Sequence, residues 1–162
     1  MLECYRKWRY LQQGHAVGNR TEIAMTVVAI KRQSMTLDDF FTGLVAGLAA
    51  RGVRVVSIRG EQFHKAMEDV YRTANREARE EGVKLKFAIT RNELHGDSPD
   101  VREALAKGVQ RDIVSLDNPE YQNMRLKISK SFAPDYFRRL PGREEMYLKM
   151  ADTFLAEYPA FQ

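Results

Sequence analysis

Cysteine is nearly absent from this sequence, and long apolar runs are absent altogether. The one cysteine, Cys4, has no partner for an intrachain disulfide or a paired-cysteine metal site, as is typical of proteins in a reducing compartment. The longest apolar stretches, such as 44–50, fall far short of the ~20 residues that a membrane-spanning helix needs. The basic start of the chain leads into Gln12 and Gln13, where a signal peptide would have its apolar core. We therefore expect a cytoplasmic protein without a membrane segment.

The common catalytic and cofactor motifs are also missing. There is no His-Glu-x-x-His pair, no glycine-rich phosphate loop and no Ser-His-Asp order that can be assembled. His64 and Glu68 lie one helical turn apart, and His95 lies two residues before Asp97, but neither pair has a third metal ligand. We therefore expect no metal and no cofactor. If the protein is an enzyme, His95 and Asp97 are the pair that would share proton transfer in a small hydrolase-type site.

The excess positive charge lies at one end of the chain. Residues 1–35 hold six Lys or Arg against two Asp or Glu, whereas residues 36–162 hold twenty of each. A basic arm of this kind suits polyanions, and a solvated tail has the same composition. The length of 162 residues, with 44% of them hydrophobic, is enough for one sizeable core. We predict a basic N-terminal arm over 1–35 and a single α+β domain over 36–162.

Apolar periodicity predicts a mainly helical domain with short strands. Thr36 is a candidate N-cap, and the apolar residues after it recur at helical spacing until Gly52. Gly43 and Gly47 lie inside this helix, where each costs about 1 kcal/mol relative to alanine, which favours a packing role. The predicted helices cover 36–51, 61–81 and 98–108, and Pro134 and Pro141 open two more. The predicted strands cover 53–58, 83–89, 113–116 and 124–128, the last two forming a β-hairpin around the turn residues 117–119.

The stretch from about residue 60 to 129 runs helix, short segment, capped helix, then hairpin. This order resembles the winged-helix layout of many bacterial transcriptional regulators. In that resemblance, 90–96 form the first helix of a helix-turn-helix, 98–108 the recognition helix and 112–129 the wing. The residues of the recognition helix that would face the core are Val101, Leu105 and Val109.

The resemblance implies a DNA-binding regulatory or accessory protein. Cations on, before and after the recognition helix would contact mainly phosphate, which gives salt-dependent affinity without sequence choice. The predicted nucleic-acid-binding residues are Arg91, Asn92, Arg102, Lys107, Arg111, Arg125 and Lys127. Acidic residues crowd the first turn of the same helix, where they repel phosphate and equally favour a solvated helix start. These acids are Asp97, Asp100 and Glu103.

A second basic cluster follows the hairpin. Its cations are Arg125, Lys127, Lys130, Arg138, Arg139 and Arg143, and the aromatic residues Phe132, Tyr136 and Phe137 lie among them. This composition suits base stacking combined with neutralisation of backbone charge. Aromatic residues at this spacing are also typical of a core. Exposure of Tyr136 or Phe137 would favour stacking.

The last helix predicts an alternative function. Its apolar residues Tyr147, Met150, Phe154, Leu155 and Tyr158 spread around more than one stripe. That width predicts either plain core or a homodimer formed through this helix. A dimer is compatible with DNA binding, because winged-helix proteins commonly bind two half-sites. The competing prediction is a protein-interaction or dimerisation module with no nucleic-acid role.

Overall fold

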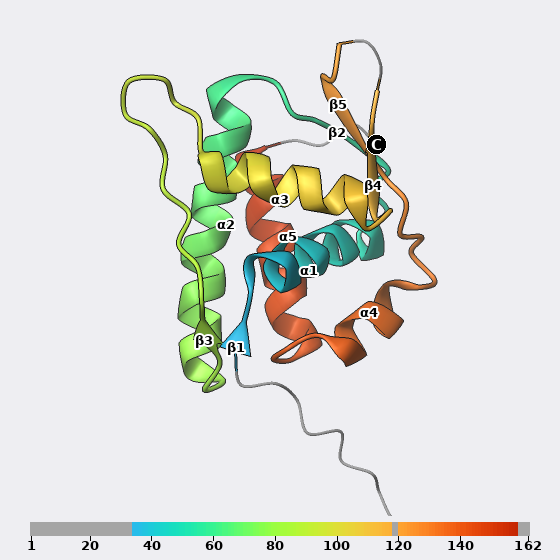
Figure 1. Ribbon diagram of the computed structural model, residues 1–162. Coiled ribbons are helices and arrows are strands. Elements are labelled where there is room, and N and C mark those ends of the chain that lie inside the picture. Colours follow the sequence, from blue (N-terminus) through green and yellow to red (C-terminus); the bar gives the residue numbers. More distant parts are fainter. Residues whose placement is uncertain (1–33, 118–119, 159–162) are drawn as a thin grey trace, which may run out of the picture.

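The computed structural model describes residues 34–117 and 120–158. Within them the helices are α1 (Leu37–Ala50), α2 (Gly60–Glu80), α3 (Pro99–Gln110), α4 (Ala133–Arg139) and α5 (Glu144–Glu157) (Figure 1). The strands are β1 (Ser34–Met35), β2 (Val55–Ser57), β3 (Lys84–Leu85), β4 (Val114–Leu116) and β5 (Asn123–Leu126). The α+β class is therefore confirmed. The arm predicted for 1–35 lies outside the described residues, except that Ser34 and Met35 pair in parallel with β3.

Helix α1 lies at the centre of the core. Every residue from Asp39 to Ala49 is buried, and a helix that is apolar on all sides has to be enclosed. Helices α3, α4 and α5 enclose it (Figure 1). At its start, Oγ1 of Thr36 accepts the N–H of Asp39 at 3.2 Å, and the Asp39 carboxylate accepts the N–H of Thr36 at 3.1 Å. This capping box fixes the helix start at the predicted residue.

Two glycines allow α5 to approach α1 closely. A Cβ on Gly43 would lie 2.2 Å from the ring of Tyr147, and a Cβ on Gly47 would lie 2.6 Å from its carbonyl oxygen. The ring is fully buried and stacks on Phe137 with centroids 5.7 Å apart. Its hydroxyl donates to the carbonyl of Pro141. The packing role predicted for both glycines is confirmed.

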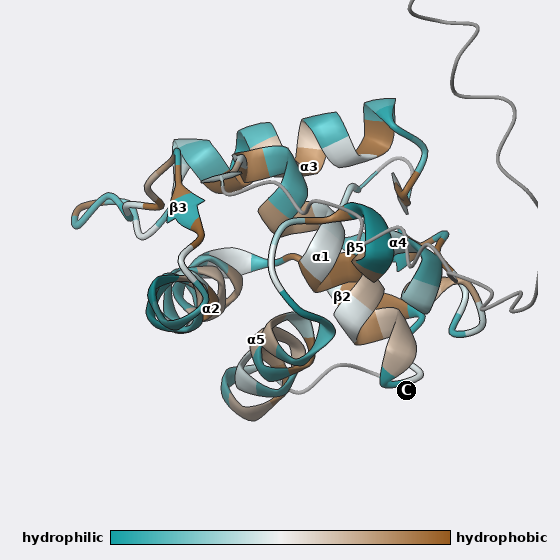
Figure 2. Cartoon of the chain, turned by 90° about the horizontal axis from the view of Figure 1, so that it is seen from below, coloured by the Kyte–Doolittle hydropathy of each residue, from teal (hydrophilic) through white to brown (hydrophobic). Residues whose placement is uncertain are grey.

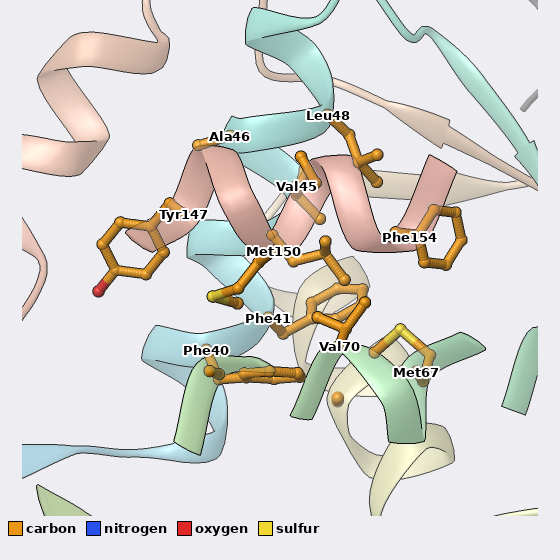
Figure 3. Close-up of a cluster of buried hydrophobic side chains, with 14 of the residues drawn as sticks. Phe40, Phe41, Val45, Ala46, Leu48, Met67, Val70, Tyr147, Met150 and Phe154 are labelled. Atoms are coloured by element: carbon orange, nitrogen blue, oxygen red, sulfur yellow. The ribbon is translucent and has the colours of Figure 1, made fainter. Parts of the chain in front are cut away.

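Helix α2 packs against α5 with the apolar stripe that its sequence predicts. The buried apolar residues of the stripe are Phe63, Ala66, Met67, Val70, Ala74 and Ala78. Figure 3 shows Met67 and Val70 of α2 in one cluster with Met150 and Phe154 of α5 and side chains of α1. The three helices therefore share a single core.

A buried carboxylate, Glu77, stands at the contact of α2 with α5. Lys149 donates a 2.5 Å hydrogen bond to its Oε2, and Arg76 lies 3.3 Å from its Oε1. The hydrogen bond from Lys149 is the main cause that lowers the pKa of Glu77, so this carboxylate is charged at neutral pH. The hydroxyls of Thr73 and Thr153 also meet across the contact at 3.1 Å. These polar pairs fix how α5 lies along α2.

The three-stranded antiparallel sheet has the order β2-β5-β4, with β5 in the centre. Arg125 pairs with Val55 on one side and Ser115 on the other. Its neighbours Met124 and Leu126 are buried, whereas Arg125 is exposed, because successive side chains of a strand point to opposite faces. The predicted hairpin is confirmed, and the sheet has one buried and one solvated face.

Helix α3 begins at the predicted cap. Oγ of Ser98 accepts the N–H of Val101 at 3.4 Å. The N–H of Ser98 in turn donates to Nδ1 of His64 on α2 at 3.2 Å. Burial lowers the pKa of His64, which favours the neutral ring that can accept this bond. The start of α3 is thus tied to α2.

The buried face of α3 differs from the prediction at one residue. Val101 and Leu105 are buried, but Val109 is 42% exposed, so its predicted core position is wrong. The residue before it, Gly108, packs against the ring of Phe41 instead, where a Cβ would lie 2.5 Å away. Figure 2 shows the hydrophobic side of α3 toward α1 and the hydrophilic side away from it.

The loop before α3 corrects a second prediction. Residues 90–96 form turns and not the first helix of a helix-turn-helix. Oδ1 of Asn92 accepts the N–H groups of Leu94 at 2.8 Å and His95 at 3.2 Å. Gly96 has φ +68° and donates to the carbonyl of Asn92 at 2.7 Å. Such side-chain bonds to the backbone compete with a helix.

Several element bounds also differ from the prediction. The strands predicted for 83–89 and 53–58 are reduced to β3 and β2, and α5 begins three residues after Pro141. Residues 118–119 of the predicted turn lie outside the described residues. No helix in the described ranges is long and apolar enough to cross a membrane.

The apolar residues on which a dimer through α5 was predicted lie in the core of this chain. Tyr147, Met150 and Phe154 are fully buried, and Tyr158 is 9% exposed. Leu155 is partly buried and packs against the same core. The exposed residues of α5 are Glu144, Glu145, Lys149, Asp152, Ala156 and Glu157. Contacts with α1 and α2 therefore explain the apolar width of this helix, and that width no longer supports a homodimer.

Candidate nucleic-acid interface

The two predicted contact residues in the loop before α3 are engaged within the chain. Nε of Arg91 lies 3.5 Å from Oε2 of Glu68 on α2. The side chain of Asn92 holds the turn described above. Asn92 is therefore explained by the conformation of this loop, and the charge of Arg91 is matched by a carboxylate.

The predicted cations of α3 and its C-terminal end all meet carboxylates. The pairs are Arg102 with Asp97, Lys107 with Glu103 at 2.7 Å and Asp38 at 3.4 Å, and Arg111 with Asp38 at 3.9 Å. The hydrogen bond to Glu103 is the main cause that raises the pKa of Lys107. The exposed side of α3 therefore presents paired charges and not a row of free cations.

The two predicted cations of the wing strand lie together on the outer face of the sheet. Both Arg125 and Lys127 are exposed. Lys127 pairs with Asp112. Arg125 has no ion pair with any carboxylate of the described residues. Of the seven predicted residues, these two are brought onto one surface, where Arg125 is the one without a carboxylate partner among the described residues.

A hollow of about 320 Å³ lies beside this strand. Its lining residues are Ala49, Gly52, Val53, Arg54, Arg125, Leu126, Lys127, Ile128, Ser129 and Lys130. Four of them are cations and none is acidic. We call this hollow, with its four cations Arg54, Arg125, Lys127 and Lys130, the basic groove. Arg54 and Lys130 are both exposed and, like Arg125, have no carboxylate partner among the described residues.

Two further hollows share lining residues with this one. The first, of about 190 Å³, shares Arg125 and is otherwise lined by Val55, Ser115, Leu116, Asp117 and Asn123. The second, of about 290 Å³, shares Lys127, Ile128 and Ser129 and is otherwise lined by Phe132, Asp135, Tyr136 and Arg139. The three hollows therefore adjoin through shared lining residues, and together we call them the path from the β4–β5 hairpin to α4.

The acidic residues on this path lie at its two ends and are engaged. Asp117 accepts the N–H groups of Gln122 at 2.8 Å and Asn123 at 2.7 Å. The bonds from Asn123 are the main cause that lowers the pKa of Asp117. At the other end, the Asp135 carboxylate pairs with Arg138. The middle of the path is therefore the most positive part.

The aromatic residues of the second basic cluster separate into core and surface. Phe137 is 2% exposed and stacks on Tyr147 in the core, so it cannot stack a base. Tyr136 is partly buried and Phe132 is 61% exposed. Both line the hollow next to α4. The exposed aromatic is thus Phe132, which sequence spacing alone did not single out.

The histidine and carboxylate pair proposed for catalysis is not assembled into a site. His95 is exposed in the turn before α3, and the Asp97 carboxylate pairs with Arg102. Over residues 34–117 and 120–158, no three His, Cys, Asp or Glu side chains converge to hold a metal ion.

Sequence reasoning found half of the basic groove. It missed Arg54, because the position of this residue beside β5 depends on the antiparallel pairing of β2 with β5. The carbonyl of Arg54, just before β2, accepts the N–H of Leu126 at 2.8 Å. Lys130 was recognised as part of a basic cluster but not as a site residue. The available signal was the concentration of cations just after the hairpin.

No family model, curated protein or solved structure matches the chain. The candidate interface is therefore defined by its own geometry.

Proposed function

We propose that the protein binds nucleic acid, with DNA as the expected ligand, by placing phosphate groups along the basic groove. The observation that carries this proposal is a hollow lined by four cations and no carboxylate, beside the wing hairpin. Three of the four, Arg54, Arg125 and Lys130, are exposed and lack an acidic partner among the described residues. Phosphate contacts of this kind supply most of the affinity of non-specific binding.

The arrangement of the elements adds support. Helices α2 and α3 precede the β4–β5 hairpin, and β2 completes a sheet with that hairpin. The order of helix, capped helix and hairpin is the one on which the winged-helix resemblance rests, although the first helix that it assigned to 90–96 is replaced by turns. The paired cations of α3 are a secondary contact surface in the proposal, because an exposed ion pair contributes only about 0–1 kcal/mol and phosphate can compete for it.

The test is fluorescence anisotropy of a labelled oligonucleotide titrated with the full chain between about 50 and 200 mM salt. Each neutralised phosphate contributes about 0.7–0.9 to the slope of log affinity against log salt. Changing Arg54, Arg125 and Lys130 together to Gln should therefore reduce the slope by about 2–3 and weaken binding at low salt.

The matched control changes Lys65, Arg79 and Lys84 to Gln. These residues are exposed cations of α2 and β3 without an ion pair among the described residues, so the net charge changes by the same amount. We expect the control to keep most of the slope. Equal losses in the two triple variants, or no binding by the unmodified protein at the lowest salt, would contradict the proposal.

A further inference from the structure

We propose, resting on the function above, that the hollow next to α4 holds an unpaired nucleobase, so that the protein prefers single-stranded over double-stranded nucleic acid. The hollow is lined by Phe132 and Tyr136 together with Lys127 and Arg139. Its volume of about 290 Å³ is just below the range of about 300–1,000 Å³ for small-ligand pockets. That size suits one flat ring.

The backbone of Phe132 is fixed on both sides by hydrogen bonds. Its N–H donates to the carbonyl of Ser129 at 3.0 Å, and its carbonyl accepts the N–H of Asp135 at 3.1 Å. The residues Ala133 and Phe137 anchor the start and the middle of α4 in the core, at 0% and 2% exposure. The ring is nevertheless 61% exposed. An aromatic ring that is exposed in a hollow can accept the face of a base.

The charges around the ring match a strand that passes over the groove. Lys127 belongs both to the basic groove and to the hollow of Phe132, so phosphates in the groove would bring the next base to the ring. Asp135 repels phosphate less because its charge is matched by Arg138. Aromatic rings beside a positively charged groove are the general device for binding single strands.

A paired base cannot use this hollow. In a duplex both faces of a base are covered by its neighbours, whereas a base in a single strand can leave the stack and lie on an aromatic ring. The proposed preference for single strands therefore follows from the position of Phe132, and the cations alone would not produce it.

The experiment compares a labelled oligothymidine with a blunt duplex of the same length, using anisotropy at one low salt concentration. Phe132→Ala should weaken binding of the single strand by about 5- to 140-fold, the range for one base stack, and change duplex binding little. Phe132→Trp keeps an aromatic ring and should bind the single strand about as tightly as the unmodified protein. In a Trp8→Phe background, the indole of Phe132→Trp should also be quenched by the single strand.

The outcomes separate this inference from the proposed function. If Phe132→Ala changes neither ligand, or both equally, while the groove triple variant weakens both, the stacking site is refuted and the groove remains. If neither ligand binds the unmodified protein, both proposals fail. Because Phe132 is exposed, we expect its variants to unfold at the same urea concentration as the unmodified protein, and that measurement excludes loss of folding as the cause.

Discussion

Replacing Gly47 by Ala tests the close approach of α1 and α5, on which the core depends. Alanine is favoured over glycine inside a helix by about 1 kcal/mol, so helix propensity alone predicts a more stable protein. The new Cβ, however, would lie 2.6 Å from the carbonyl oxygen of Tyr147 and 3.0 Å from Cβ of Ala151. Both atoms belong to a second buried helix, and overpacking of this kind costs about 1–3 kcal/mol. We expect a net loss of up to about 2 kcal/mol in the free energy of unfolding.

Urea denaturation gives the sign of this change directly, provided that the slope of the transition is unaltered. Ala106→Gly is the control, because Ala106 lies on the exposed side of α3 and its loss measures helix propensity alone, about 1 kcal/mol. Gly43→Ala should also destabilise, since the ring of Tyr147 that it meets is buried. A Gly47→Ala variant more stable than the unmodified protein would refute the packing of α5 on α1.

Three further predictions concern charged groups. Burial lowers the pKa of His64. The neutral ring therefore contributes its full stability above pH 6.5, and this contribution is lost as the pH falls below that value. His64→Gln should flatten the pH dependence of thermal unfolding below pH 6.5. Breaking a buried ion pair costs about 3–5 kcal/mol, and Lys149→Met should cost less because Lys149 is 55% exposed. Since the pKa of Glu77 is lowered, urea titrations should show the full loss of stability at neutral pH and a smaller loss below pH 4.5. Asp38→Asn removes the carboxylate that Arg111 meets and that Lys107 meets in addition to Glu103. Since α3 is only a secondary contact surface in the proposal, this variant should tighten nucleic-acid binding in anisotropy titrations no more than Asp152→Asn, and a larger gain would make α3 a main contact surface.

Local signals explain why most helices could be predicted. Thr36 and Ser98 each form the side-chain cap that their residue type favours. The stripe of α2 recurs every three or four residues over its whole length, so its buried face follows from sequence alone. The helix predicted for 90–96 was wrong because of another local signal: the side chain of Asn92 accepts backbone N–H groups and so competes with a helix. Local sequence patterns therefore predicted the structure correctly where no second local pattern competed with them.

The candidate site was harder because its electrostatics depend on contacts distant in sequence. Lys107 and Arg111 look free on a helical wheel, yet both meet Asp38 of α1, about seventy residues earlier in the chain. Arg54 looks like an isolated surface cation, yet strand pairing places it beside Leu126. A sequence shows how many charges a segment carries, but only the fold decides which of them find partners.

This difference between the two groups of cations decides where phosphate is expected to bind. Surface cations that already have a carboxylate within reach must exchange one ionic partner for another, so they gain little from a phosphate. Arg125 has no such partner among the described residues, and the antiparallel sheet holds its backbone on both sides. An unpaired cation on a backbone that a sheet holds loses less conformational entropy on binding than one on a flexible segment. The outer face of β5, and not the recognition-helix position of α3, is for this reason the surface at which the search for a nucleic-acid ligand should begin.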